Sequence, residues 1–275
     1  MHLLPSGLTE PSSGHPDRRA DRAAEGGASR QREIINAFVD MSNELVEDRD
    51  VVDVLSQLVS RCAHLLDVVS AGLLIADGRG VLHLAAYSCE RTHHLEILQL
   101  QRDEGPCLDC FTGGQAVLVP DLETEKHQWP QFRRAASEVG LRSVHALPMR
   151  LSGDVLGALG LFDDQPGALD KDDLDLAQAL LHVATVAVVS DRPRTGRATA
   201  SSLLQRALTS RIVVEQAKGV IAQAGDLEME DAFAVLRRYA RDRSTKLSVV
   251  ASQIVGREVH YETLVQRACS APERP

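Results

Sequence analysis

The chain changes its hydrophobic pattern at a short charged segment, residues 192–197, which contains a proline and a glycine. Before this segment, apolar runs of strand length alternate with helical patterns. From Ser201 onward the sequence shows helical periodicity and no strand signal. The sequence therefore predicts an α+β module, an antiparallel sheet with flanking helices, followed by an all-α module of three helices.

The strand signals of the first module form two predicted hairpins. One pairs residues 71–76 with 81–87 across the turn Asp77-Gly-Arg-Gly80, and the other pairs 143–150 with 155–162 across Ser152-Gly-Asp154. Helical patterns cover residues 51–66 and 170–189. In the second module we expect helices over about 202–224, 229–241 and 245–255, with Ser244 as the cap of the last one.

Both ends of the chain are predicted to be disordered or flexible. Residues 1–32 are rich in Ser, Gly, Pro and charged residues and cannot bury enough apolar surface to offset the entropy of ordering. We expect a disordered tail over 1–32, the sheet module over 33–190, a linker over 191–201, the helical module over 202–262 and a flexible tail over 263–275.

Composition narrows the class of protein. No apolar run reaches the roughly 18 residues that a membrane span needs, and the N-terminus has no secretory pattern. Five cysteines without framework spacing suit a reducing compartment, so we expect a cytoplasmic protein with no membrane partner. Aromatic residues make up 3% of the chain, which disfavours binding of single strands on stacked rings.

Charge is unevenly distributed between the two modules. The formal net charge is -9, and residues 34–190 hold 11 Lys and Arg against 24 Asp and Glu. Residues 203–260 instead hold 9 basic residues against 7 acidic ones, and Asp242 is the single acid within 233–246. A solvated helix face is the ordinary explanation of such a run, but a face built for solubility usually mixes both signs.

These cations are the candidate site of the helical module. The predicted stripe of Ala232, Phe233, Leu236 and Ala240 faces a core, which leaves the basic residues off that stripe. The candidate RNA-contacting residues are Lys218, Arg237, Arg241, Arg243 and Lys246. Lys218 has a second interpretation, as a structural residue whose stem packs beside Ala217 and Gly219.

Three motifs of this module resemble the ANTAR domain family. They are Glu215-Gln-Ala-Lys-Gly219, then Ala232-Phe-Ala-Val-Leu-Arg237 with Ala240, then Leu247-Ser-Val-Val-Ala251. The resemblance implies a three-helix module that binds RNA stem-loops and acts in transcription antitermination. It also implies a homodimer, for which Leu204, Leu208 and Ile212 offer an apolar seam; packing of that seam against its own domain is the alternative.

The first module resembles a GAF sensor domain over about residues 40–190. The motifs are Glu104-Gly-Pro-Cys107, Trp129-Pro-Gln-Phe132, Gly140-Leu-Arg-Ser-Val144 and Gly157-Ala-Leu-Gly-Leu-Phe162. The combination is particularly like the GAF domains that precede ANTAR domains in actinobacterial regulators. The resemblance implies a pocket for a small molecule, but it does not identify the ligand, and no cofactor is evident.

Two cysteines and a tryptophan are the candidate ligand or redox residues of this module. Cys107 and Cys110 are either an incidental pair or a redox switch. A zinc site would need a second ligand pair, which His127 and His145 do not supply in a recognised pattern, so we expect no metal. Trp129 is either a loop anchor or a lid over a pocket.

The leading hypothesis is a cytoplasmic regulator in which a GAF sensor gates RNA binding by an ANTAR domain. One alternative is a redox protein, since certain GAF domains reduce free methionine sulfoxide with cysteines. The other alternative is a DNA-binding regulator built on the short C-terminal helices.

Overall fold

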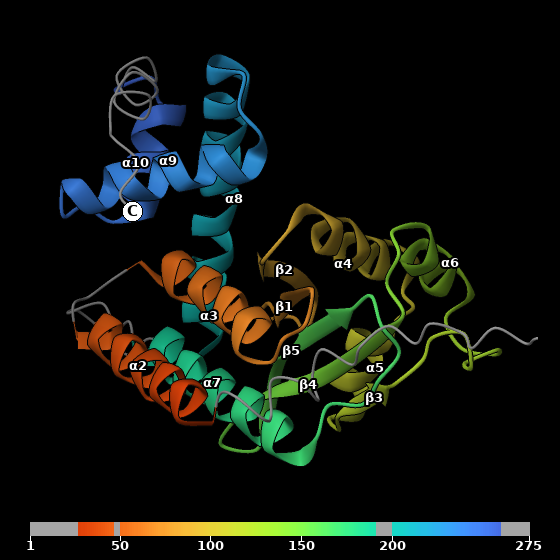
Figure 1. The fold of residues 1–275 in the computed structure, drawn as a ribbon. Coiled ribbons are helices and arrows are strands. Elements are labelled where there is room, and N and C mark those ends of the chain that lie inside the picture. Colours follow the sequence, from red (N-terminus) through yellow and green to blue (C-terminus); the bar gives the residue numbers. More distant parts are fainter. Residues whose placement is uncertain (1–26, 47–49, 191–199, 260–275) are drawn as a thin grey trace, which may run out of the picture.

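The computed structural model describes residues 27–46, 50–190 and 200–259, and its centre is a five-stranded antiparallel sheet. The strand order is β2-β1-β5-β4-β3 (Figure 1). The strands are β1 (Ser70–Ala76), β2 (Leu82–Tyr87), β3 (Val117–Val119), β4 (Ser143–Leu151) and β5 (Asp154–Asp163). The two predicted hairpins are β1–β2 and β4–β5, and both are confirmed.

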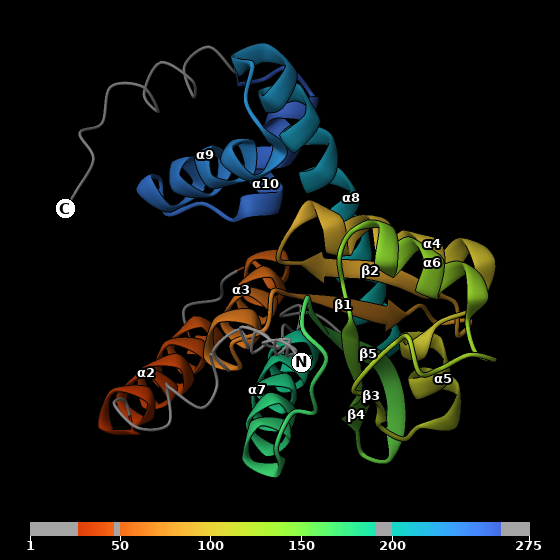
Figure 2. The same ribbon diagram turned by 45° about the vertical axis from the view of Figure 1, so that its right-hand side comes forward.

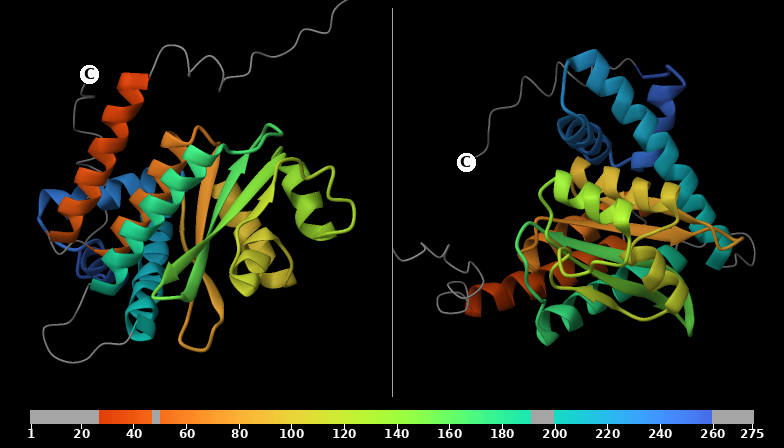
Figure 3. Two further views of the ribbon diagram at one scale, coloured as in Figure 1. Left: turned by 90° about the horizontal axis from the view of Figure 1, so that it is seen from below. Right: turned by 90° about the vertical axis from the view of Figure 1, so that its right-hand side faces the viewer.

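Helices cover both faces of the sheet, as Figures 2 and 3 show. One layer contains α2 (Gly27–Val46), α3 (Val51–Leu65) and α7 (Lys171–Ser190). The other contains α4 (Glu90–Arg102), α5 (Pro106–Gly113) and α6 (Pro130–Glu138). Side chains of β1 alternate between them: Leu73 and Ile75 join the core under α3 and α7, whereas Leu74 joins the core under α5 and α6. Burial on both faces explains why β1 reads as a continuous apolar run.

The predicted boundary between the disordered tail and the sheet module is wrong, because helix α2 begins before it. Residues 27–32, which we expected in the disordered tail, form the first turns of this helix, and residues 1–26 lie outside the described part of the chain. Ala37 and Met41 bury the apolar side of α2 in the core. Arg30 also forms an ion pair with Asp173 of α7. Tertiary contacts therefore order a segment whose composition alone predicts disorder.

The second module consists of α8 (Ala200–Gly225), α9 (Met229–Asp242) and α10 (Leu247–Val255). The fold class of both modules is as predicted. The linker prediction of 191–201 is too long at its end, because Ala200 already belongs to α8, and residues 191–199 and 260–275 lie outside the described ranges. Ser244 is not the cap of α10, because the N-cap position is Lys246 and Ser244 has a positive φ of 49° in the turn before it.

The two modules pack against each other along α8. This helix contacts α3, α7 and β2 of the sheet module as well as α9 and α10 (Figure 1). The buried apolar residues of α8, α9 and α10 belong to the same cluster as those of α2, α3 and α7. Among the described residues, no helix combines the length and the apolar character that crossing a membrane requires.

Candidate nucleic-acid interface

Helix α9 presents arginines on the side opposite its buried stripe. Of the predicted stripe, Ala232, Leu236 and Ala240 are buried and Phe233 is half-buried. Arg238 and Arg241 are exposed. Glu230 and Asp231 occupy the first turn of the helix and Arg241 the last, which complements the helix dipole at both ends. The cations thus collect at the C-terminal end of α9, away from the acids of its first turn.

The turn after α9 adds two further basic residues. Arg243 is exposed, and its guanidinium lies 4.2 Å from the centroid of the Tyr239 ring. This cation–π contact holds the planar group at the surface without consuming its hydrogen-bond donors. Lys246 is half-buried at the start of α10. The exposed group formed by Arg238, Arg241 and Arg243 is called the arginine cluster below.

Arg237 faces the sheet module instead of solvent. Its Nε lies 2.6 Å from Oδ1 of Asp53 on α3, and its side chain is 27% exposed. The ion pair joins the two modules directly.

Lys218 is buried where α8 crosses the sheet module. Its Nζ donates to the Tyr87 hydroxyl at 2.8 Å and to Glu215 at 3.1 Å, and it lies 3.7 Å from Glu90. With 3% of its side chain exposed, Lys218 is not presented to RNA in this arrangement. The structure therefore separates the predicted contact residues: Arg241 and Arg243 are exposed, Lys246 is half-buried, and Lys218 and Arg237 lie at the contact between the modules.

Sequence reasoning missed the residues that surround Lys218. Arg211 is buried, forms an ion pair with Glu215, and lies with its guanidinium 4.6 Å from the Tyr87 ring centroid. Glu215 was part of the quoted motif but had no assigned role. The spacing of Arg211, Glu215 and Lys218, four and three residues apart, places them on one face of a helix and was the available signal. Arg238 was also left out, although it is exposed.

The predicted dimer seam is mostly covered by the chain itself. Leu204 and Leu208 are buried in the core that the two modules share, whereas Ile212 is 60% exposed. The first two side chains therefore have their apolar partners within one molecule.

The interior of the sheet module holds a polar cluster under α4 and α5. Glu96 and Gln99 of α4 are fully buried, and the Gln99 amide donates to Glu96 at 2.8 Å. Gln99 also accepts the backbone N–H of Cys107, whose Sγ lies 3.7 Å from Glu96. Gly72 of β1 makes room for this cluster, because a Cβ there would lie 2.6 Å from the Glu96 carboxylate. Burial raises the pKa of Glu96 to about 8, so its neutral form predominates at pH 7.

Cys107 and Cys110 are both buried free thiols. Burial, with a smaller contribution from the Glu96 charge, raises the pKa of Cys107 well above its ordinary value. Burial also raises the pKa of Cys110 to about 12. The thiolate is the reactive form of cysteine, so this environment suppresses redox and nucleophilic chemistry.

We expect Cys107 and Cys110 to resist alkylation by iodoacetamide in the native protein, while half-exposed Cys89 reacts. Peptide mass spectrometry over a time course measures each site, and urea-unfolded protein supplies the fully reactive control. If Cys107 is labelled as fast as Cys89, the Cys107 thiol is not buried and unreactive as described here.

Trp129 anchors the loop that leads into α6. Its indole Nε1 donates to Asp109 of α5 at 3.0 Å, and the ring is buried. Glu104 caps the same helix by accepting the N–H groups of Gln131 and Phe132 at 2.6 and 2.8 Å. These contacts give the Glu104 and Trp129 motifs a structural role in joining α5 to α6.

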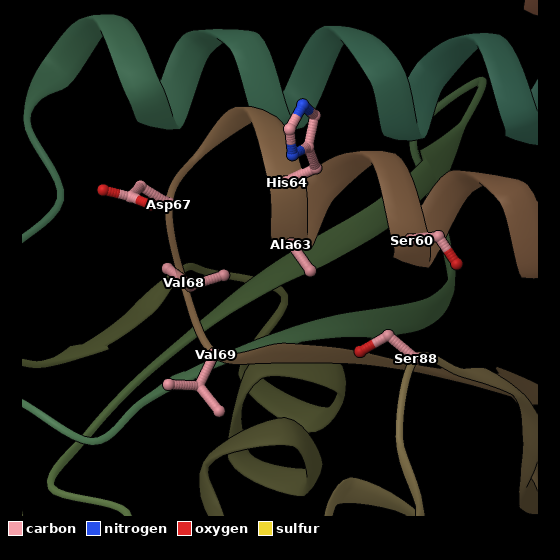
Figure 4. Close-up of a pocket in the computed structure, with 7 residues that line it drawn as sticks. All are labelled: Ser60, Ala63, His64, Asp67, Val68, Val69 and Ser88. Carbon is pink, nitrogen blue, oxygen red and sulfur yellow. The ribbon is translucent and has the colours of Figure 1, made fainter. Parts of the chain in front are cut away.

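An open groove on the sheet module has a volume of about 410 Å³. It is lined by Ser60, Ala63, His64, Asp67, Val68, Val69 and Ser88, from the end of α3 and the segments flanking β1 and β2. Figure 4 shows these side chains pointing in different directions rather than toward one point. The groove therefore does not by itself define a ligand site.

The fold consists of an α+β domain on a five-stranded antiparallel sheet, followed by a module of three helices. The GAF domain model matches residues 48–189, and the ANTAR domain model matches residues 203–255. The chain belongs to the GAF domain family and carries a C-terminal ANTAR domain. This domain combination is typical of signal transduction. Among curated proteins, none matches this sequence.

Solved structures similar to this chain include several GAF domains. The GAF domain of Acinetobacter phosphoenolpyruvate-protein phosphotransferase is 15% identical with a TM-score of 0.47, over 60% of this chain and 97% of that one. Free methionine-R-sulfoxide reductase from Neisseria meningitidis is 16% identical with a TM-score of 0.46, over 70% and 98%. A GAF domain/HD domain protein from Geobacter sulfurreducens is 21% identical with a TM-score of 0.43, over 53% and 97%. Structural similarity with so low a sequence identity and TM-score says nothing about the function of this chain.

Proposed function

We propose that this protein is a cytoplasmic regulator that binds RNA stem-loops through its ANTAR domain and controls transcription termination or antitermination, gated by its GAF domain. The observation that carries the proposal is the arginine cluster at the end of α9. Arg238, Arg241 and Arg243 are exposed within six residues, and Asp242 is the one acid between them.

Folded RNA fits this surface chemically. A stem-loop presents closely spaced phosphates, and the planar guanidinium donates two parallel hydrogen bonds to such a group. Unpaired loop bases also stack on arginine planes. Because the whole chain carries a net charge of -9, binding must depend on this local cluster and must weaken as salt rises.

The structure favours neither of the two alternative functions, a cysteine-based redox protein or a DNA-binding regulator. Buried thiols with raised pKa values argue against cysteine-based reduction, so we propose no catalytic role. For a DNA-binding role, α9 would have to enter a major groove, and the arginines at its end and in the following turn suit phosphate contact better than a row of base contacts.

The test begins with sequencing of RNA that is crosslinked to the protein in its native cells. A fluorescent stem-loop from the recovered transcripts is then titrated with the full chain and with the variant Arg241→Gln/Arg243→Gln. We expect the variant to bind at least about tenfold more weakly, because each lost arginine removes a charge-assisted contact. The slope of log K against log salt should fall by about one per lost phosphate contact.

The matched control is Arg134→Gln/Lys171→Gln. It removes the same charge from exposed residues of the sheet module, where the paired acids contribute little to stability. Equal affinity of the variant and this control, with unchanged circular dichroism, would disprove the proposed surface. Tighter binding to duplex DNA at the same salt concentration would favour the DNA-binding alternative.

A further inference from the structure

The N-terminus of α10 is capped by a carboxylate from the GAF domain. Lys246 stands at the N-cap position, and its side chain supplies no capping hydrogen bond. Asp50 supplies it instead: its Oδ2 accepts the backbone N–H of Ser248 at 2.7 Å, while its Oδ1 accepts the N–H of Val52 at 3.0 Å. One carboxylate thus caps α3 in its own domain and α10 in the other.

An acidic residue inside α3 holds a cation of α9. Asp53 lies one turn after Asp50 and forms the ion pair with Arg237 described above. Both partners are largely shielded from solvent, with side-chain exposures of 12% and 27%. Such a pair is screened by salt less than a surface pair.

The third contact is built around Tyr87 at the end of β2. Its hydroxyl donates to Glu215 at 3.1 Å and accepts from Lys218, and its ring lies beneath the charges of Arg211 and Lys218. Glu90, at the start of α4, lies 3.7 Å from the Lys218 amine. Two cations of α8 are therefore held by an aromatic ring and a carboxylate of the GAF domain.

We propose that this docking face, formed by Asp50, Asp53, Tyr87 and Glu90, holds the regulator in a closed state: Asp50 caps α10, while the other three occupy cations of the ANTAR domain in place of RNA phosphates. The inference rests on the RNA-binding function proposed above. It adds a specific mechanism of gating: RNA and the GAF domain compete for Lys218 and Arg237 of the ANTAR domain.

Charge and geometry support the competition. Carboxylates and phosphates make the same kind of hydrogen bond with guanidinium and ammonium groups. In the docked form Lys218 and Arg237 are held by the GAF domain, while Arg241 and Arg243 stay exposed. The docked form therefore offers RNA only part of the basic surface, and opening completes it. Apparent RNA affinity then scales with the open fraction.

Helix α4 links the docking face to the GAF interior. Glu90 begins this helix, and Glu96 and Gln99 lie on its buried side. A ligand that displaces α4 from within the sheet module would move Glu90 relative to Lys218.

The test weakens the docking face without touching the ANTAR domain. The variant Asp53→Asn/Tyr87→Phe removes the charge that pairs with Arg237 and the hydroxyl that bonds Lys218. Asp175→Asn, an exposed acid on α7, is the charge-matched control. Docking is measured without RNA, as the rate of Lys218 acetylation by sulfo-NHS-acetate and as hydrogen exchange at the Ser248 amide. RNA affinity is measured with the fluorescent stem-loop from the crosslinked transcripts.

We expect faster acetylation of Lys218, faster exchange at Ser248 and an RNA affinity at least about fivefold higher in the double variant, and no change in the control. Unaltered acetylation and exchange would show that these contacts do not hold the domains together, and would overturn the proposal. If acetylation of Lys218 is faster but RNA affinity does not rise, the proposed competition between RNA and the GAF domain is wrong. The contact between the two domains would still be supported. If no variant binds the stem-loop, the proposed function itself fails. Asp53→Asn alone replaces the double variant if circular dichroism shows that the latter is unfolded.

Discussion

Replacing Glu96 with glutamine is expected to stabilise the protein at pH 8 and to change its stability little at pH 5. The wild-type carboxyl is fully buried, and burial raises its pKa from 4.5 to about 8. A carboxyl with a raised pKa in the folded state contributes stability below the unfolded pKa, and that contribution is lost as the pH rises toward the folded pKa. The free energy of unfolding should therefore fall between about pH 4.5 and pH 8 in the wild type.

Glutamine keeps the shape and one acceptor oxygen of Glu96 but carries no charge at any pH. The shift in pKa corresponds to about 3–5 kcal/mol at pH 8, which glutamine should recover. Denaturation midpoints at pH 5, 6.5 and 8 measure the difference between variant and wild type, which cancels the other titrating groups. Glu138→Gln, on the exposed face of α6, is the control. A difference that is constant across this pH range would mean that Glu96 is not held neutral.

Leu208→Ala is expected to lower the free energy of unfolding by about 2–5 kcal/mol, because it leaves a cavity in a packed core. Leu208 lies in the cluster that the two domains share. Ile212, one turn further along α8, is 60% exposed, so Ile212→Ala should stay within about 0.5 kcal/mol of the wild type. Urea unfolding monitored by circular dichroism measures both variants.

The same pair of variants tests the predicted dimer seam. If a second copy packed on Leu204, Leu208 and Ile212 together, truncation of Ile212 would weaken the dimer. Sedimentation velocity over a range of protein concentrations measures that effect. A clear loss of dimer in Ile212→Ala would show that the exposed side chain of this stripe serves a second molecule.

The sheet was predictable because its signals are local. The turn at residues 77–80 and the turn at 152–154 each join two apolar runs, and a hairpin needs little beyond that pattern. Helix α9 was predictable for a similar reason, since Leu236 and Ala240 mark its buried side. The family motifs identified both modules and their order, a GAF domain followed by an ANTAR domain.

The contacts between the modules were not predictable from such patterns. Lys218 is buried because Tyr87, 131 residues earlier in the chain, lies against it. A helical stripe shows that Leu204 and Leu208 need an apolar partner, but it does not show whether that partner is the same molecule or another. Composition likewise suggested disorder for residues 27–32, which the contact of α2 with α3 and α7 orders.

Helix α8 belongs to the ANTAR domain but also packs against the GAF domain, so one rigid element touches both. Its 26 residues extend over about 39 Å at 1.5 Å per residue. A tilt of about 10° at the end that rests on the sheet domain would displace the far end by about 7 Å, if the helix moves as a rod of this rise. A displacement of that size exceeds the reach of a hydrogen bond, so a small rearrangement at one end is enough to carry α9 and α10, which pack on α8, out of hydrogen-bonding range of Asp53 and Asp50.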